Sequence, residues 1–279
     1  MIVALHSPPR GFFKTSSPHT NDELAQFVQK AALLGFKAIQ IGPLTDYVTI
    51  KSECLRKVLD DANIDRNVHV GGLYDADKFA LADEEYAAEK KQIHYGIKLC
   101  VGISSALVSV HPPFFSTGGK VNEKVLSEAR TRFLKLMKEE VDFANRNGIK
   151  VALESFCYRP FIFDGLLDFA QFVSNFPSEK LGVLLDVGHL YQIGINIHDA
   201  VNMFKHRLLD IHVHDATLEK DYKKATHLPI GTGTVNFQKL INLLRQNGYK
   251  GWLTLEIRGT EKEIVDSKEY LERLIEALP

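Results

Sequence analysis

The stretch NGIKVALE, residues 147–154, reads as the end of a helix, a glycine that closes it, and a short buried strand. The same order recurs in LGFKAIQI at residues 34–41 and in NGYKGWLTLE at residues 247–256. Glycine is favoured just after a helix because it adopts the left-handed backbone of the last turn without steric cost. The recurrence therefore predicts repeated units in which a helix is followed by a strand.

Short runs rich in β-branched residues alternate with longer amphipathic segments along the chain, which is typical of βα units. The predicted strands are Ile2–His6, Ala38–Ile41, Val68–Gly72, Ala106–His111, Lys150–Glu154, Gly182–Asp186, Leu209–His214 and Leu253–Ile257. The predicted helices include Asn21–Leu34, Glu84–Leu99, Asn122–Asn147, Leu166–Phe176, Phe237–Asn247 and Ser267–Leu278. Polar or turn-forming residues follow each of the strands.

Eight predicted strands with helices between them, in 279 residues, match the size of a single (β/α)8 TIM barrel. No linker rich in Pro, Gly or Ser divides the chain, so we expect one domain over residues 1–279. A doubly wound sheet would usually carry a glycine-rich phosphate loop after its first strand, and residues 7–20, SPPRGFFKTSSPHT, are not such a loop. The barrel is therefore the preferred fold.

The composition, 45% hydrophobic and 25% charged, is that of a globular protein with a large core. The 34 Lys and Arg residues balance 35 Asp and Glu residues, which disfavours nucleic acid or an anionic membrane as a partner. Three widely spaced cysteines match neither a disulfide framework nor a CxxC metal site. Because no apolar run resembles a signal peptide or a membrane span, we expect a cytoplasmic protein. A homo-oligomer is compatible with this sequence.

Side chains with metal-binding or acid–base chemistry stand at the carboxyl ends of the predicted strands, where the active sites of (β/α)8 barrels form. A glutamate that ends a hydrophobic run, as in VALE and LTLE, is costly to bury without a partner. Carboxylates that meet in one barrel mouth also repel each other unless a cation lies between them. These residues are His6, His69, His111, Glu154, Asp186, His189, His212, His214, Asp215 and Glu256, with His227 soon after.

A divalent metal supplies that cation, and three carboxylates with one imidazole suit Mn²⁺, Mg²⁺ or Co²⁺. The predicted principal ligands are Glu154, Asp186, His212 and Glu256. Additional imidazoles would make the mouth rich enough in nitrogen for Zn²⁺ and for a second ion. The candidates for that second ion, or for substrate contacts, are His69, His111, His189 and His227.

Three smaller features lie around the predicted site, and each has two interpretations. The glycine-rich segment GTGTVNF, residues 231–237, either binds an anion with its N–H groups or is a tight loop capped by Thr234 or Asn236. Arg258 is expected near the site, where it pairs with a substrate phosphate or with an acidic neighbour. Aromatic residues after the fourth and fifth strands either wall a ligand site or pack their loops: Phe114, Phe115, Phe156, Tyr158 and Phe161.

In their order and spacing, several motifs resemble the xylose isomerase-like TIM-barrel superfamily, which groups sugar isomerases and epimerases with nucleases of the endonuclease IV type. These motifs are ALES around Glu154, LLDVGH at 184–189, H-x-x-D from His212 to Asp215, HLPIGTGTVNF at 227–237 and GWLTLEI with Glu256. The resemblance covers essentially the whole chain. It implies that Glu154, Asp186, His212 and Glu256 are the common metal ligands, and that His189 binds substrate or a second ion.

The first functional class that follows is a metal-dependent sugar or sugar-phosphate isomerase or epimerase. Such an enzyme removes a proton next to a carbonyl and stabilises the resulting ene-diolate with its metal. Glu154 and Glu256 are the expected acid–base pair, facing each other across the barrel mouth so that a proton is exchanged on two faces of the substrate.

The alternative class is an endonuclease IV-like apurinic-site phosphodiesterase with a multinuclear zinc site. Most ligands of the nuclease pattern are present, but Ala225 stands where that pattern has an Asp. The nearest basic cluster, Lys220, Lys223 and Lys224, is interspersed with acidic residues and is read as a solvated loop. The isomerase or epimerase is therefore preferred; a related lyase, or a barrel that has lost catalysis, is a third interpretation.

Overall fold

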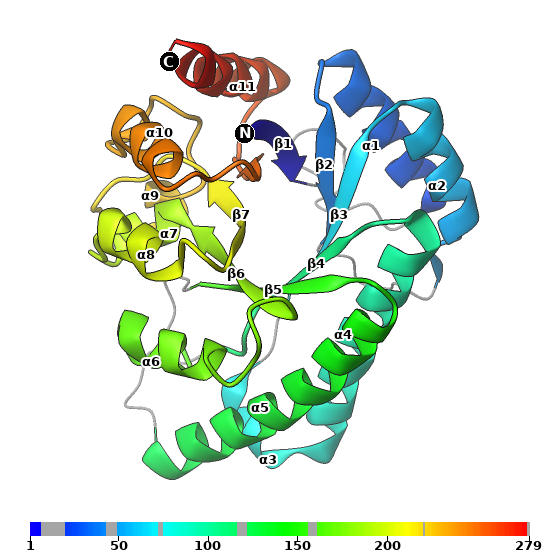
Figure 1. Ribbon diagram of the computed structural model, residues 1–279, viewed down its shortest axis with the longest axis vertical. Coiled ribbons are helices and arrows are strands. Elements are labelled where there is room, and N and C mark those ends of the chain that lie inside the picture. Colours follow the sequence, from blue (N-terminus) through cyan, green and yellow to red (C-terminus); the bar gives the residue numbers. More distant parts are fainter. Residues whose placement is uncertain are drawn as a thin grey trace.

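The computed structural model describes residues 1–6, 20–42, 49–71, 75–115, 122–155, 161–219 and 221–277. Its parallel strands pair in chain order and close, with β8 against β1, so the predicted (β/α)8 barrel is confirmed (Figure 1). The strands are β1 (Ile2–His6), β2 (Ala38–Ile41), β3 (Asp65–Val70), β4 (Leu107–Val110), β5 (Lys150–Glu154), β6 (Leu181–Asp186), β7 (Leu208–Val213) and β8 (Trp252–Leu255).

The described helices surround the strands, as Figure 1 shows. They are α1 (Asn21–Leu33), α2 (Ser52–Asp61), α3 (Ala76–Leu81), α4 (Asp83–Ile103), α5 (Glu123–Arg146), α6 (Gly165–Val173), α7 (Val187–Gln192), α8 (Ile197–Phe204), α9 (Tyr222–Ala225), α10 (Phe237–Gln246) and α11 (Glu261–Glu276). Their inner faces bury apolar side chains against the barrel, for example Phe27 and Phe133. Among the described helices, none combines the length and apolarity that a membrane crossing requires.

The glycines of the three quoted helix-to-strand segments have the predicted backbone. Gly35, Gly148 and Gly248 have φ values of 77°, 74° and 71°, in the left-handed region that glycine adopts freely. Each lies between a helix and the next strand, after α1, α5 and α10 respectively. The sequence signal and the structure therefore agree on how these βα units are joined.

Some predicted bounds were wrong. Helix α11 begins at Glu261 rather than Ser267, because Thr260 and Glu263 form a reciprocal capping box that starts the helix earlier. The sequence reading also missed α2, α3, α7, α8 and α9. Helix α7 was not predicted because it begins directly at the end of a strand. The Asp186 side chain accepts the His189 N–H at 2.8 Å and is the N-cap of this helix.

Candidate metal centre

Four consecutive strands bring the predicted principal ligands to one mouth of the barrel. Glu154 and Asp186 are the last residues of β5 and β6, His212 lies near the end of β7, and Glu256 directly follows β8. The strand register places Asp186 beside His212. The Glu256 N–H donates to the carbonyl of Val213 at 3.1 Å, which fixes the backbone from which this glutamate projects.

The two glutamates do not face each other across the mouth, contrary to the sequence expectation. They come from β5 and β8, which are separated by β6 and β7 on one side of the closed ring. Both instead approach the same imidazole: His212 Nδ1 lies 3.6 Å from Glu154 Oε1 and 2.9 Å from Glu256 Oε2. Both carboxylates therefore converge on the same ring nitrogen of His212.

Glu154, Asp186 and His212 form a compact set of possible metal ligands. One ligand atom from each lies within 4.8 Å of the others. All three side chains are buried, whereas the side chain of Glu256 is 26% exposed. The cluster is thus deep, with Glu256 on its accessible side.

The ligand atoms of this cluster lack the partners that buried polar atoms normally have. Glu154 Oε2 and Asp186 Oδ2 are buried and make no hydrogen bond, and the 2.9 Å approach of Glu256 Oε2 to the buried His212 Nδ1 lacks hydrogen-bond geometry. An unpaired buried carboxylate is strongly unfavourable, and a divalent cation bound to all three atoms would remove this cost. The donor set and its unsatisfied atoms therefore fit a metal ion.

The neighbouring charges set the protonation of this cluster, in which a cation would replace the second proton of His212. Burial disfavours a charged His212, but the Glu256 and Glu154 carboxylates outweigh it and hold the pKa of His212 well above 6.5. Burial alone would raise the pKa of Glu256, but His227 and His6 lower it well below 4.5. Against burial, His189 and His214 likewise lower the pKa of Asp186. The carboxylates of Asp186 and Glu256 are therefore ionised at neutral pH.

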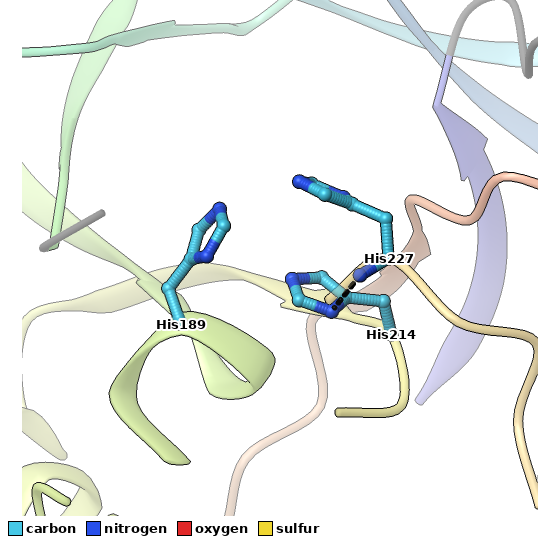
Figure 2. Close-up of side chains that lie close together, drawn as sticks. All are labelled: His189, His214 and His227. Carbon is cyan, nitrogen blue, oxygen red and sulfur yellow. Dashed lines mark hydrogen bonds between the residues drawn. The ribbon is translucent and has the colours of Figure 1, made fainter. Parts of the chain in front are cut away.

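A second cluster consists of His189, His214 and His227, whose rings surround a common space in Figure 2. One nitrogen from each ring lies within 4.8 Å of the others. His227 has a left-handed backbone, with φ 54°, which is uncommon for a residue with a side chain and is often found at functional sites. Its Nδ1 lies 3.0 Å from the Glu256 carbonyl, so it donates there and its Nε2 carries the lone pair.

His214 is the member of this cluster that the sequence reading did not select as a ligand. Its Nδ1 accepts the backbone N–H of His227 at 2.9 Å (Figure 2). The neutral ring therefore carries its proton on Nε2, which lies 3.0 Å from Asp186 Oδ1. Gly188 permits this approach, because a Cβ there would lie 2.0 Å from His214 Cε1. His214 thus supports Asp186, and His189 and His227 are the members better suited to a second ion.

The other two predicted histidines, His69 and His111, are not members of this second cluster. The Nε2 atom of His69 is 3.5 Å from Glu154 Oε2, and its Nδ1 atom is 2.9 Å from the Ser109 hydroxyl, so His69 borders the first cluster. His111 belongs to neither cluster of described residues; its Nδ1 donates to the Pro112 carbonyl at 2.7 Å, and Phe114 and Phe161 lie edge-on to its ring.

The structure also places the smaller predicted features. Arg258 donates its backbone N–H to the His227 carbonyl at 2.7 Å, which ties it to the rim of the second cluster. Ala225 is fully buried at the end of α9. Phe114, Phe115 and Phe161 are buried against the core, as expected for loop packing. Phe156, Tyr158 and Lys220, together with the side chain of Lys223, lie outside the described residues.

The glycine-rich segment is a tight loop that already holds an anion from its own chain. Asn236 caps α10 by accepting the Lys239 N–H at 2.9 Å. Asp215 Oδ2 accepts the Gly231 N–H at 2.8 Å, and Asp215 Oδ1 accepts the N–H groups of Val235 at 3.0 Å and Ala216 at 2.9 Å. Two of the loop's own N–H groups are therefore bound to Asp215, which sequence reasoning did not anticipate.

Burial of neutral histidines makes the metal-free site sensitive to acid. Burial lowers the pKa of His189 from 6.5 to about 4, so as the pH falls the unfolded chain binds this proton first. His189 therefore contributes to the free energy of unfolding above pH 6.5, and this contribution is lost as the pH falls from 6.5 to about 4. The free energy of unfolding should fall by about 1 kcal/mol between pH 7 and pH 5.5 from this residue. We expect His189→Gln to remove this part of the pH dependence.

Urea unfolding of the metal-free protein at pH 7 and pH 5.5 measures the effect. The comparison with wild type matters because His212, whose pKa is raised, contributes in the opposite direction. His198→Gln, at an exposed position on α8, is the matched control for the loss of a histidine outside the cluster. An equal loss of stability in His189→Gln and wild type would contradict the assignment.

The chain belongs to the xylose isomerase-like TIM barrel family, whose model matches residues 28–274. The resemblance inferred from the motifs is thereby confirmed. A solved structure described as a D-tagatose 3-epimerase-like protein superposes with a TM-score of 0.80 at 22% identity, covering 99% of this chain and 98% of that one. At this identity the likeness shows a shared fold.

Curated relatives come from more than one functional class. An uncharacterised protein of Methanocaldococcus jannaschii is 28% identical over 182 residues, 62% of this chain and 58% of the relative. The inosose isomerase of Halalkalibacterium halodurans is 23% identical over 155 residues, 53% of this chain and 54% of the relative. A probable endonuclease 4 of Mycoplasma pneumoniae is 22% identical over 160 residues, 54% of this chain and 53% of the relative. The chain thus spans little more than half the length of each.

Proposed function

We propose that this protein is a divalent-metal-dependent isomerase or epimerase of a sugar or sugar phosphate, acting by proton transfer next to a carbonyl. The observation that carries the proposal is the set of unpartnered buried atoms on Glu154, Asp186 and His212, with the more accessible carboxylate of Glu256 against the same imidazole. The likeness to an inosose isomerase and the fold shared with an epimerase-like protein support the same class.

Glu154, Asp186, His212 and Glu256 would hold the cation. Three carboxylates and one imidazole favour Mn²⁺, Mg²⁺ or Co²⁺, while the nearby His189 and His227 allow Zn²⁺. A bound divalent ion supplies electrostatic stabilisation of negative charge on two neighbouring substrate oxygens.

Glu154 and Glu256 would move the proton. Their carboxylates both lie close to Nδ1 of His212, so a substrate carbon bound beside this nitrogen would have two bases within reach. Glu256 is the more exposed of the two and is held ionised, able to accept a proton from carbon and return it. His189 and Arg258, at the rim, are the proposed substrate contacts for hydroxyl or phosphate oxygens.

The metal content of the purified protein, measured by mass spectrometry, tests this class against the nuclease. One Mn, Mg or Co per chain is the expected result. Close to three Zn per chain would instead support a multinuclear phosphodiesterase. A purified protein that cannot be loaded with any divalent metal would count against both classes.

We expect no efficient incision of abasic DNA, although a probable endonuclease 4 is among the relatives. Three divalent ions repel each other within a few ångströms and need enough anionic ligands to be held. Ala225 stands where the nuclease pattern has an Asp, and it has no atom that can bind a metal. An ion held by His227 would therefore lack the carboxylate that this Asp supplies. The near-neutral chain, with net charge −1, also offers few phosphate contacts.

The measurement is incubation of the zinc-loaded protein with a duplex that contains one abasic site. An otherwise identical duplex without that site serves as the control substrate. Rapid incision confined to the abasic site, together with about three bound zinc ions per chain, would overturn the proposed isomerase class.

A further inference from the structure

Gln40, on β2, is a fully buried amide at the centre of a hydrogen-bond network inside the barrel. Its Oε1 atom lies 2.7 Å from His6 Nδ1 and 2.7 Å from His212 Nε2. Its Nε2 atom donates to Asp210 Oδ2 at 2.9 Å and to the Ser109 hydroxyl at 3.3 Å. Both hydrogens and both lone pairs of the amide are therefore used.

The network fixes which way this amide points. Asp210 Oδ1 already accepts the Thr254 hydroxyl and the Ile211 N–H, each at 2.8 Å. The Gln40 NH2 group faces Asp210 Oδ2 and the Ser109 hydroxyl, to both of which it donates. The amide oxygen is then left facing the two imidazoles.

We propose that Gln40 is a positioning residue that holds the protons of His6 on Nδ1 and of His212 on Nε2, so that Nδ1 of His212 is the ring nitrogen presented to the cation. An amide oxygen only accepts, so each ring must donate its N–H to Gln40. The role in cation binding rests on the proposed function, whereas the placement of the two protons does not.

The position of the His212 proton decides which ring nitrogen faces the carboxylates. With Nε2–H held by Gln40, His212 Nδ1 is directed at Glu256 Oε2, 2.9 Å away, and at Glu154 Oε1, 3.6 Å away. In the metal-free protein the neighbouring carboxylates favour a second proton on Nδ1, and a bound cation would take the place of that proton. Without the Gln40 acceptor, a ring that gives up one proton would be free to keep the other on Nδ1, beside Glu256, where it would compete with the metal.

Histidine ring nitrogens and their protons, observed by NMR, test the inference before any metal or substrate is added. In wild type we expect His6 to carry its proton on Nδ1 and His212 to show a protected Nε2–H. Gln40→Met, which has similar length but no acceptor oxygen, should move the His6 proton to Nε2 and expose the His212 Nε2–H to exchange. Gln40→Glu should preserve both, because a carboxyl that shares one proton with Asp210 still offers an acceptor to both rings.

Thr254→Val is the matched control, since it removes a buried hydrogen bond to Asp210 and leaves the imidazole contacts of Gln40 in place. Mn²⁺ binding measured by electron paramagnetic resonance gives the second readout. We expect Gln40→Met to weaken Mn²⁺ binding by about 10- to 100-fold, and Gln40→Glu to stay within a few-fold of wild type.

A wild-type His6 with its proton on Nε2 overturns the inference, and this holds even if the methionine variant does not fold. Unchanged ring protons and Mn²⁺ affinity in a folded Gln40→Met also overturn it, while the proposed function stands. If wild type binds no Mn²⁺ but its ring protons respond to Gln40→Met as described, the proposed function fails and the tautomer role of Gln40 is supported.

Discussion

Replacing Glu256 with Gln is expected to slow the exchange of the substrate carbon-bound hydrogen with solvent by about 10²- to 10⁴-fold, the usual contribution of general acid–base catalysis. Glutamine has nearly the same shape but cannot accept a proton at its amide oxygen near neutral pH. Glu256 Oε2 lies against His212, and its Oε1 is 3.8 Å from His227 Nδ1 and 3.9 Å from His6 Nε2, so the carboxylate is fixed in place. Glu154→Gln should have an effect in the same range.

Deuterium incorporation in heavy water, over a panel of ketoses and their phosphates, measures this exchange. Glu140→Gln is the matched control, because Glu140 is buried on α5 and pairs with His94 at 3.1 Å, away from the mouth. A full rate in Glu256→Gln would refute its role as a base. If metal-loaded wild type incorporates no deuterium and forms no product across the panel, the isomerase class itself is wrong.

The double variant Glu154→Gln, Glu256→Gln is expected to lose most of its bound metal. It removes two of the three carboxylates and leaves Asp186 and His212 as ligands. Loss of a residue that merely supports a ligand costs about 10- to 100-fold in metal affinity, so loss of two anionic ligands should exceed this.

Metal content after dialysis against buffered Mn²⁺, together with circular dichroism to verify folding, decides the outcome. A matched double variant, Glu89→Gln, Glu140→Gln, changes two buried glutamates that lie on α4 and α5 outside the cluster. It should keep its metal. A folded Glu154→Gln, Glu256→Gln protein with full metal occupancy would show that the principal site has been assigned to the wrong residues.

The fold was predictable because its signals are local and repeated. A glycine after a helix and a short apolar strand recur at Gly35, Gly148 and Gly248, and strands of this kind close into a barrel. The positions of Glu154 and Asp186 followed from the same logic, since the carboxyl ends of parallel strands meet in one mouth. The expected opposition of Glu154 and Glu256 was wrong because their strands, β5 and β8, are three apart in the ring of eight and so are not opposite each other. Distances between side chains were not encoded in the local signals.

Two residues of the site needed the structure. His214 stands two positions after His212, and this alternation in DIHVHD was a signal that both rings reach the mouth. Its contact with Asp186 could not be inferred, because it depends on the close approach that Gly188 permits. Gln40 lies in the apolar run AIQI, and a single buried amide there gives no indication of which long-range partners it will meet.

The carboxylate of Asp215 occupies N–H groups of the glycine-rich loop that could otherwise bind an anionic ligand. Because this side chain binds the N–H groups of Gly231 and Val235, a substrate phosphate would have to displace a covalently tethered anion to use them. Gly233 tightens the arrangement, since a Cβ there would lie 2.4 Å from Asp215 Oδ1. These two N–H groups are thus already occupied by an anion of the chain itself, and the loop does not offer them to a phosphate as an empty anion site would.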